Sequence, residues 1–130
     1  MEMIIDFPHG AQVDAHFGQY TIKTDQAMPV GEGSAPTPFA MFLASIGTCA
    51  GIFVLSFCQQ RQLSTDGIRI VERIQQRQTS HLVEMIELEI QVPASFPAKY
   101  YDALVRAADQ CAVKRHLENP PQFNVHTTVV

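Results

Sequence analysis

Hydrophobic and polar residues alternate in short runs over the first part of the chain, a pattern typical of β-strands. Pro8, Gly10 and Gly18 separate these runs. The expected strands cover residues 3–6, 11–17 and 20–23. The following residues, 24–38, contain three prolines and two glycines and predict a loop.

The segment from Pro36 to Gln60 contains no charged residue, and prolines at its start suit the first turn of a helix. We expect a helix over residues 37–62. Its length would suffice to span a bilayer. However, its small and polar residues, and the lack of flanking Trp, Tyr or clustered cations, favour a helix buried in protein. We therefore expect no membrane insertion.

In two further segments apolar and polar residues alternate with period two. They predict a hairpin of strands over residues 68–75 and 82–92, with a turn near 78–80. This register brings Arg73 near Glu87, so we interpret its arginines as members of cross-strand ion pairs. Apolar residues spaced by three and four then predict a helix over 97–117. A last strand is expected over 123–129.

The predicted order is β-β-β-α-β-β-α-β in a single domain, residues 1–130, of the α+β class. A long uncharged helix in so small a domain needs cover on every side, which one small sheet cannot give. The small residues Ala44, Gly47, Thr48 and Gly51 would allow another helix to approach closely. We therefore expect a homodimer.

The charge balance, nine Lys and Arg against thirteen Asp and Glu, gives a net charge of −4 and argues against nucleic-acid binding. The N-terminus lacks the basic and apolar regions of a signal peptide, so we expect a cytoplasmic protein. The five histidines show no metal-binding spacing, and no phosphate-binding or dinucleotide motif is present. We expect neither a metal nor a cofactor, and we expect Asp14 and His16 to face solvent.

Three cysteines are too few for a disulfide scaffold. Cys49 lies in the uncharged helix and Cys111 on the inner stripe of the second helix, where Lys114 and Arg115 would favour a thiolate. If these two cysteines are close, they can undergo dithiol–disulfide exchange. Inert core cysteines are the alternative, and periodicity alone favours them. Cys58 is interpreted as structural.

Two stretches, GEGSAPTPFAMFLASIGTCAG (31–51) and AADQCAVKRHL (107–117), resemble the family of osmotically inducible protein C and the organic hydroperoxide resistance proteins (OsmC/Ohr). The resemblance implies an intertwined α+β homodimer that reduces organic hydroperoxides. It implies that Cys49 is the peroxidatic cysteine, that Cys111 is the resolving cysteine, and that a cellular dithiol reduces the disulfide between them.

The chain departs from this family pattern at two positions. Phe39 stands where the peroxidases have a Glu, and no Arg precedes Arg61, although the peroxidases use an Arg from the N-terminal strands. Residues that would have to replace this charge are His16, Lys23, Lys114 and Arg115. The resemblance is greatest to a divergent branch of the family.

The loss of the acid leaves a second hypothesis open. Phe39 makes the expected interface pocket more apolar, and Phe42 and Phe53 would line it with Phe39. On this hypothesis the protein has the family fold but binds a small hydrophobic ligand at the dimer interface, without peroxidase activity.

Overall fold

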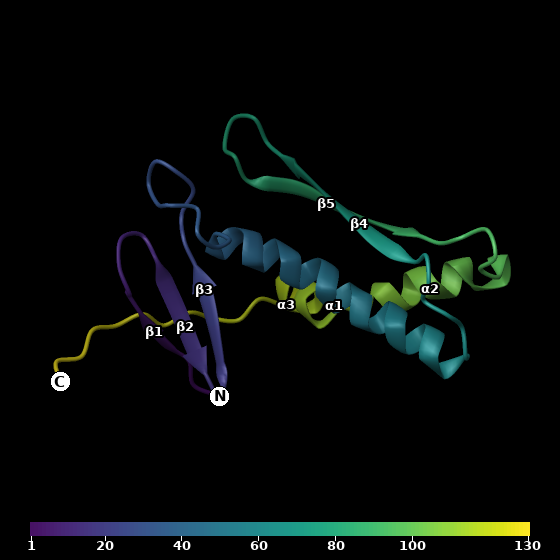
Figure 1. Cartoon of the computed structure of the whole chain (residues 1–130), viewed down its shortest axis with the longest axis horizontal. Coiled ribbons are helices and arrows are strands. Elements are labelled where there is room, and N and C mark those ends of the chain that lie inside the picture. Colours follow the sequence, from purple (N-terminus) through teal and green to yellow (C-terminus); the bar gives the residue numbers. More distant parts are fainter. The chain divides into compact units, whose positions relative to one another are not determined.

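Strands and helices are segregated along the chain in the computed structural model, which describes residues 1–130 (Figure 1). The elements are β1 (Ile4–Asp6), β2 (Val13–Phe17), β3 (Tyr20–Thr24), α1 (Pro38–Gln60), β4 (Arg69–Gln76), β5 (Val83–Gln91), the 3-10 turn η1 (Ala98–Tyr100), α2 (Tyr101–Ala108) and α3 (Ala112–Glu118). The fold is of the mixed α+β class. Two compact units, Met1–Ala44 and Ser45–Val130, are described separately below. That the chain folds as one domain stays a prediction.

The N-terminal unit contains an antiparallel sheet in the order β1-β2-β3. Its strands agree with the predicted ones within two residues. Asp25 organises the loop after β3, because its carboxylate accepts hydrogen bonds from the backbone of Gln26 and from the backbone and hydroxyl of Ser34. The two bonds from Ser34, and to a smaller extent the bond from Gln26, hold the pKa of Asp25 below its ordinary value.

Helix α1 buries one face only. The residues of this face are Ile46, Ala50, Val54, Phe57 and Cys58. By length and composition α1 could cross a membrane: its mean hydropathy is 2.0 over an 18-residue window, of which 28% is buried within the chain. A core helix of a soluble protein meets the same criterion, so the absence of membrane insertion stays a prediction.

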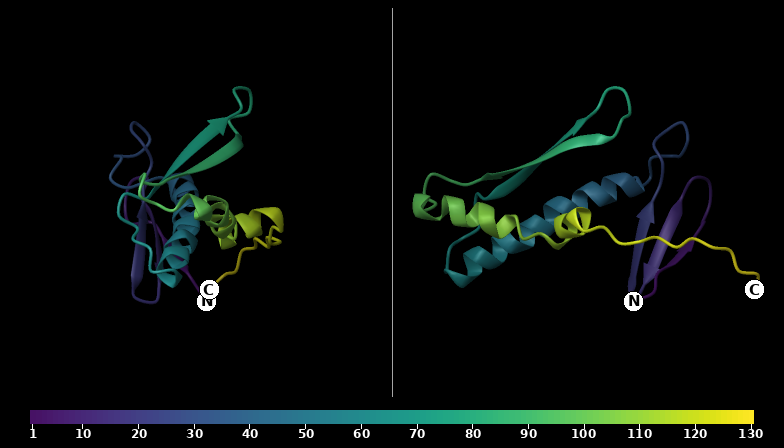
Figure 2. Two further views of the ribbon diagram at one scale, coloured as in Figure 1. Left: turned by 90° about the vertical axis from the view of Figure 1, so that its right-hand side faces the viewer. Right: turned by 180° about the vertical axis from the view of Figure 1, so that it is seen from behind.

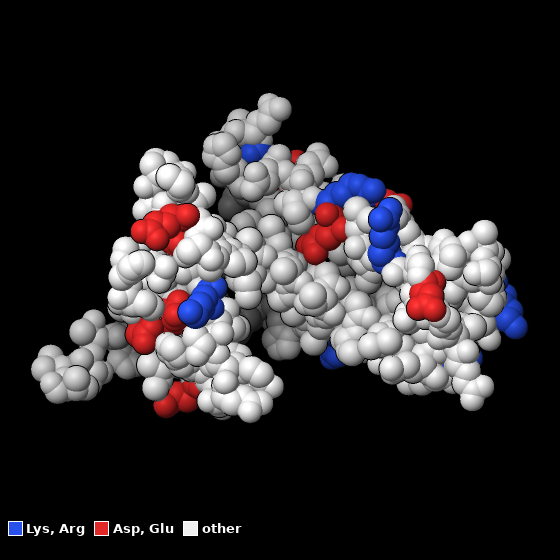
Figure 3. All heavy atoms as spheres, in the orientation of Figure 1, with Lys and Arg blue, Asp and Glu red and all other residues white.

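The hairpin of β4 and β5 covers the buried face of α1 together with α2, as Figures 1 and 2 show from three sides. Ile70, Leu88 and Ile90 pack against this core from the hairpin. On the outer face Arg73 lies 3.2 Å from Glu87 and 2.5 Å from Glu89, which confirms the predicted cross-strand pairing. Charges of both signs intermingle on the face in Figure 3, with no large patch of one sign.

Glu72 is the exception on the apolar side of the hairpin. One of its carboxylate oxygens, Oε1, is buried without a hydrogen-bond partner. A Cβ at Gly47 of α1 would lie 2.5 Å from the other oxygen, so only glycine leaves room for this carboxylate. Burial raises the pKa of Glu72, and a backbone hydrogen bond at Gly47 opposes that rise in part.

The predicted second helix, residues 97–117, is wrong as a single element. The structure breaks it into η1, α2 and α3, with a turn at Asp109 and Gln110. Asp is a poor residue for a helix interior because its short side chain competes for backbone hydrogen bonds. Cys111, predicted to lie on the inner stripe of this helix, is nevertheless buried, as are Leu104 and Ala108.

The predicted last strand, residues 123–129, is also wrong for this chain. Residues 120–130 form no helix or strand, and Phe123, Val125 and Val129 are almost fully exposed. A strand needs a neighbour that completes its backbone hydrogen bonds, and this segment pairs with neither sheet. The alternation of its residues is therefore not sufficient for a strand.

Glu72→Gln should raise the free energy of unfolding by roughly 1 kcal/mol near neutral pH, because the neutral amide avoids burying a charge. With its raised pKa, Glu72 binds more protons in the folded than in the unfolded state. Its contribution to stability is thus fully present below the ordinary Glu pKa and is lost as the pH rises through the raised one.

Urea unfolding at about pH 7 and about pH 4 tests this expectation, since the gain should shrink at the lower pH. Glu84→Gln is the matched control, because Glu84 lies exposed on β5. An equal gain at both pH values would show that the Glu72 charge is not what destabilises the protein.

Candidate functional site

The structure brings two of the three cysteines together. Cys49 is half-buried in the middle of α1, and Cys111 is buried just before α3. The two thiols are joined by a side-chain hydrogen bond. The fold thus brings near one another two thiols that lie 62 positions apart (111 − 49) in the sequence.

The break after α2 positions Cys111. Its backbone has φ −47° and ψ 123°, so it caps α3 instead of lying within a helix. Its Sγ accepts a hydrogen bond from the backbone N–H of Lys114 at 3.4 Å and lies 3.8 Å from the carbonyl oxygen of Ile46. Contacts on both sides thus fix the sulfur against α1.

The surroundings of the two thiols shift their pKa values in opposite directions. Backbone N–H groups of Val113 and Ala112 and the thiol of Cys111 donate to Cys49 and lower its pKa, although burial opposes this. Burial is the main reason that the pKa of Cys111 is raised, and its proximity to Cys49 adds to the rise. Cys49 is therefore the thiol that ionises first, while Cys111 keeps its proton.

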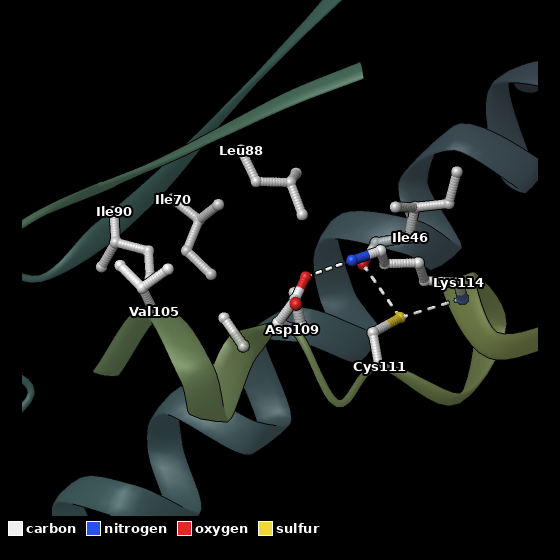
Figure 4. Close-up of a pocket in the computed structure, with 10 residues that line it drawn as sticks. Ile46, Ile70, Leu88, Ile90, Val105, Asp109, Cys111 and Lys114 are labelled. Carbon is white, nitrogen blue, oxygen red and sulfur yellow. Dashed lines mark hydrogen bonds and ion pairs between the residues drawn. The ribbon is translucent and has the colours of Figure 1, made fainter. Parts of the chain in front are cut away.

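An apolar pocket of about 160 Å³ adjoins Cys111 (Figure 4). Its walls come from α1, the hairpin and α2, and its apolar lining includes Ile46, Ile70, Leu88, Ile90 and Val105. The paired side chains of Asp109 and Lys114 stand beside Cys111 in the same lining. A cavity of about 150 Å³ with such walls accommodates a benzene-sized group.

The two predicted cationic neighbours of Cys111 do not contact it with their charged groups. The ammonium of Lys114 forms ion pairs with Asp109 and Glu118, which raise its pKa. The hydrogen bonds of Arg115 are made by its backbone, within α3. The N–H groups of the first turn of α3 lower the pKa of Cys49, whereas the ammonium of Lys114 acts only through a weaker coulombic attraction to Cys111.

The predicted helpers from the N-terminal strands lie in the other compact unit. His16 on β2 contacts Asp6 and Thr21, each at 3.1 Å, and Lys23 is exposed on β3. Asp14, expected to face solvent, is instead buried with 8% of its surface exposed. A role for His16 or Lys23 beside a thiol stays a prediction.

The three phenylalanines predicted to line an interface pocket are separated in the chain. Phe39 and Phe42 contact each other in the N-terminal unit with their rings tilted by 31° and their centroids 5.6 Å apart, and both are exposed. Phe53 lines a second cavity with Phe57 and Arg61. Their joint role in an interface pocket stays a prediction.

Cys58 is fully buried, and burial raises its pKa, as expected of a structural cysteine.

Sequence reasoning missed the backbone donors of Ala112 and Val113, and the carbonyl of Ile46. The only signal for these donors was the weak helix propensity of Asp109, which marks a second helix start immediately before them.

A sequence profile of a family described as OsmC-like protein matches residues 31–126. A comparison with curated protein sequences found no match.

Several solved structures share the fold at low sequence identity. A protein from Psychrobacter arcticus, assigned to osmotic stress and detoxification response, has a TM-score of 0.73 and 16% identity over 87% of this chain and 85% of its own. An OsmC-like protein of unknown function from Vibrio cholerae has a TM-score of 0.63 and 10% identity, covering 90% and 92%. The organic hydroperoxide resistance protein OsmC from Legionella pneumophila has a TM-score of 0.56 and 19% identity, covering 90% and 89%.

Ala112→Pro should raise the pKa of Cys49 while leaving the fold intact, because proline removes one of the donating N–H groups. Proline suits the first turn of a helix, and the ψ of 123° at Cys111 is what a residue before proline requires. The pH dependence of iodoacetamide alkylation at Cys49 measures the change. Ala112→Ser keeps the N–H and should react as the wild type does; an unchanged profile in both variants would contradict the assigned donors.

Proposed function

Because the chain belongs to the family of OsmC-like proteins, we propose that it reduces organic hydroperoxides through a dithiol–disulfide cycle between Cys49 and Cys111. The observation that carries this proposal is the hydrogen-bonded pair of thiols in which only Cys49 has a lowered pKa. The function of organic hydroperoxide resistance named for the Legionella neighbour supports it. Such an activity would serve defence against oxidative stress, and we propose a cytoplasmic location.

The first step uses the ionised thiol. The Cys49 thiolate attacks the terminal oxygen of the hydroperoxide and breaks the O–O bond, forming a sulfenic acid. The released alkoxide takes a proton from water and leaves as an alcohol. The peroxide is thereby reduced by two electrons, and Cys49 is oxidised by two. The cycle needs no cofactor.

The second step uses the neighbouring thiol. Cys111 condenses with the sulfenic acid, so that an S–S bond forms and the hydroxyl group leaves as water. A cellular dithiol then reduces the disulfide by exchange and is itself oxidised. The hydrogen bond between the two sulfurs supports this step, because the resolving thiol needs little movement to reach its target.

The apolar pocket beside Cys111 supports a hydrophobic substrate. Its aliphatic walls would bury the organic group of a hydroperoxide of about the size of a phenyl ring. Hydrogen peroxide has no such group and would gain nothing from these walls.

The second candidate is a protein of the same fold that binds a small hydrophobic ligand without reducing it. Phe39 favours this function, because it places an apolar ring where the resemblance to the family's peroxidases implies a Glu. The same pocket would then hold the ligand, and the cysteines would remain thiols.

We further propose that the protein is a homodimer in which the solvent-facing side of α1 meets a second copy. This side includes Ile52, a residue that is 53% exposed within the single chain. Covering so apolar and uncharged a helix by a partner would remove much hydrophobic surface from water.

Cumene hydroperoxide should oxidise two thiols per wild-type chain, measured by thiol counting and mass spectrometry. Cys49→Ser should lose neither remaining thiol rapidly. Cys111→Ser should accumulate a sulfenic acid at Cys49, trapped by dimedone. Cys58→Ser is the matched control and should behave as the wild type does, because Cys58 is not part of the pair.

If both thiols of the wild type survive the peroxide, the peroxidase proposal is wrong. The ligand-binding function is then tested by titration with apolar probes of phenyl size. The chemical shifts of the methyl groups of Ile70 and Leu88, measured by NMR, are the readout. Shifts confined to pocket residues would support it.

Ile52→Arg should convert the dimer into monomers, because it places a charge in the proposed apolar contact. Size-exclusion chromatography with light scattering measures the mass. Gln59→Arg adds the same charge at an exposed polar position near the end of α1 and should remain dimeric. A wild-type chain that elutes as a monomer at high concentration would contradict the proposal.

A further inference from the structure

Three side chains with metal-ligating atoms meet on one face of the N-terminal sheet. Asp6 on β1 lies directly opposite Asp14 on β2, and His16 is two residues further along β2 on the same face. One ligand atom of each lies within 4.8 Å of the others. Two carboxylate oxygens and one imidazole nitrogen form a donor set typical of divalent transition metals.

Asp14 indicates that this cluster is more than a chance group of surface acids. It is 8% exposed, yet its carboxylate forms no hydrogen bond or ion pair with the protein. Lys23 lies opposite Asp14 in the register with β3 but is exposed and forms no ion pair with it. The oxygens of Asp14 keep some contact with solvent, since they are not among the fully buried polar atoms that lack a partner. The protein supplies no counter-charge to this largely buried carboxylate, so a bound cation would be the first group to neutralise it.

The orientation of His16 suits metal binding through Nε2. Its Nδ1 lies 3.1 Å from the hydroxyl of Thr21 on β3, and Nε2 lies 3.1 Å from Oδ2 of Asp6. An Nδ1–H that donates to Thr21 leaves the Nε2 lone pair directed toward the carboxylates. Metal-bound histidines are held by such hydrogen bonds from their other ring nitrogen.

We propose that Asp6, Asp14 and His16 bind a divalent transition-metal ion such as Zn²⁺, which joins β1 to β2. The side chains of Asp6 and His16 are 55% and 40% exposed, so the ion can enter from solvent and water can complete its coordination. Small rotations bring the three ligand atoms to the separations of about 3–3.5 Å that Zn²⁺ distances require. All three residues belong to the N-terminal unit, whereas the two cysteines belong to the other unit.

The test is a titration of the reduced full-length protein with ZnCl₂ by calorimetry and with CoCl₂ by visible absorption. One equivalent should bind without a thiolate charge-transfer band. His16→Ala and Asp14→Asn should each weaken binding by more than about tenfold, and Thr21→Val by about tenfold through loss of the orienting bond. His9→Ala, an exposed histidine of the same unit, is the matched control and should bind as the wild type does.

His16→Ala changes a half-exposed residue and should fold normally, so its result stands even if Asp14→Asn unfolds. In long-range ¹H–¹⁵N spectra, the Nε2 resonance of His16 should shift on addition of Zn²⁺. The resonances of His9 should keep their chemical shifts. The proposal is wrong if binding is absent at millimolar metal, if His16→Ala binds as tightly as the wild type, or if only Cys49→Ser and Cys111→Ser abolish binding.

Discussion

One face of α1 is apolar and built largely of small and medium-sized side chains, and the rest of the C-terminal unit packs against it. Ala50, Val54 and Cys58 present little bulk, so the hairpin and α2 can both approach the same helix. The hairpin alone has one apolar face and could not form a stable unit by itself. Because both partners share one helix face, a pocket remains between them, with Ile46 and Ala50 of α1 in its lining.

The candidate dithiol site follows from this packing together with one break in the chain. If α2 continued through Cys111, the N–H groups of residues 112 and 113 would be used within the helix. The turn at Asp109 and Gln110 frees them at a new helix start, where they reach Cys49 of a different helix. The lowered pKa of Cys49 thus arises inside an uncharged helix from backbone N–H groups rather than from a cationic side chain.

Much of the fold could be predicted from the sequence, because most elements carry their own periodicity. The hairpin register, including Arg73 beside Glu87, followed from the alternation and from the turn expected near residues 78–80. The predictions of a last strand and of an unbroken second helix were wrong. A strand depends on the edge of a neighbouring strand, and the helix break depends on a local cap, and an apolar pattern encodes neither of them. For the same reason the sequence indicated the two cysteines but not the backbone donors between them. The grouping of Asp6, Asp14 and His16 depends on strand pairing, so their spacing formed no motif.

Gly47 and Glu72 illustrate how the packing of α1 limits what the sequence can become. A side chain at position 47 would collide with the carboxylate, so an alanine there is tolerated only where position 72 is shortened or turned away. Effects of substitutions at the two positions should therefore not be additive. In evolution the two positions are expected to vary as a pair, with an acid at 72 confined to lineages that retain glycine at 47.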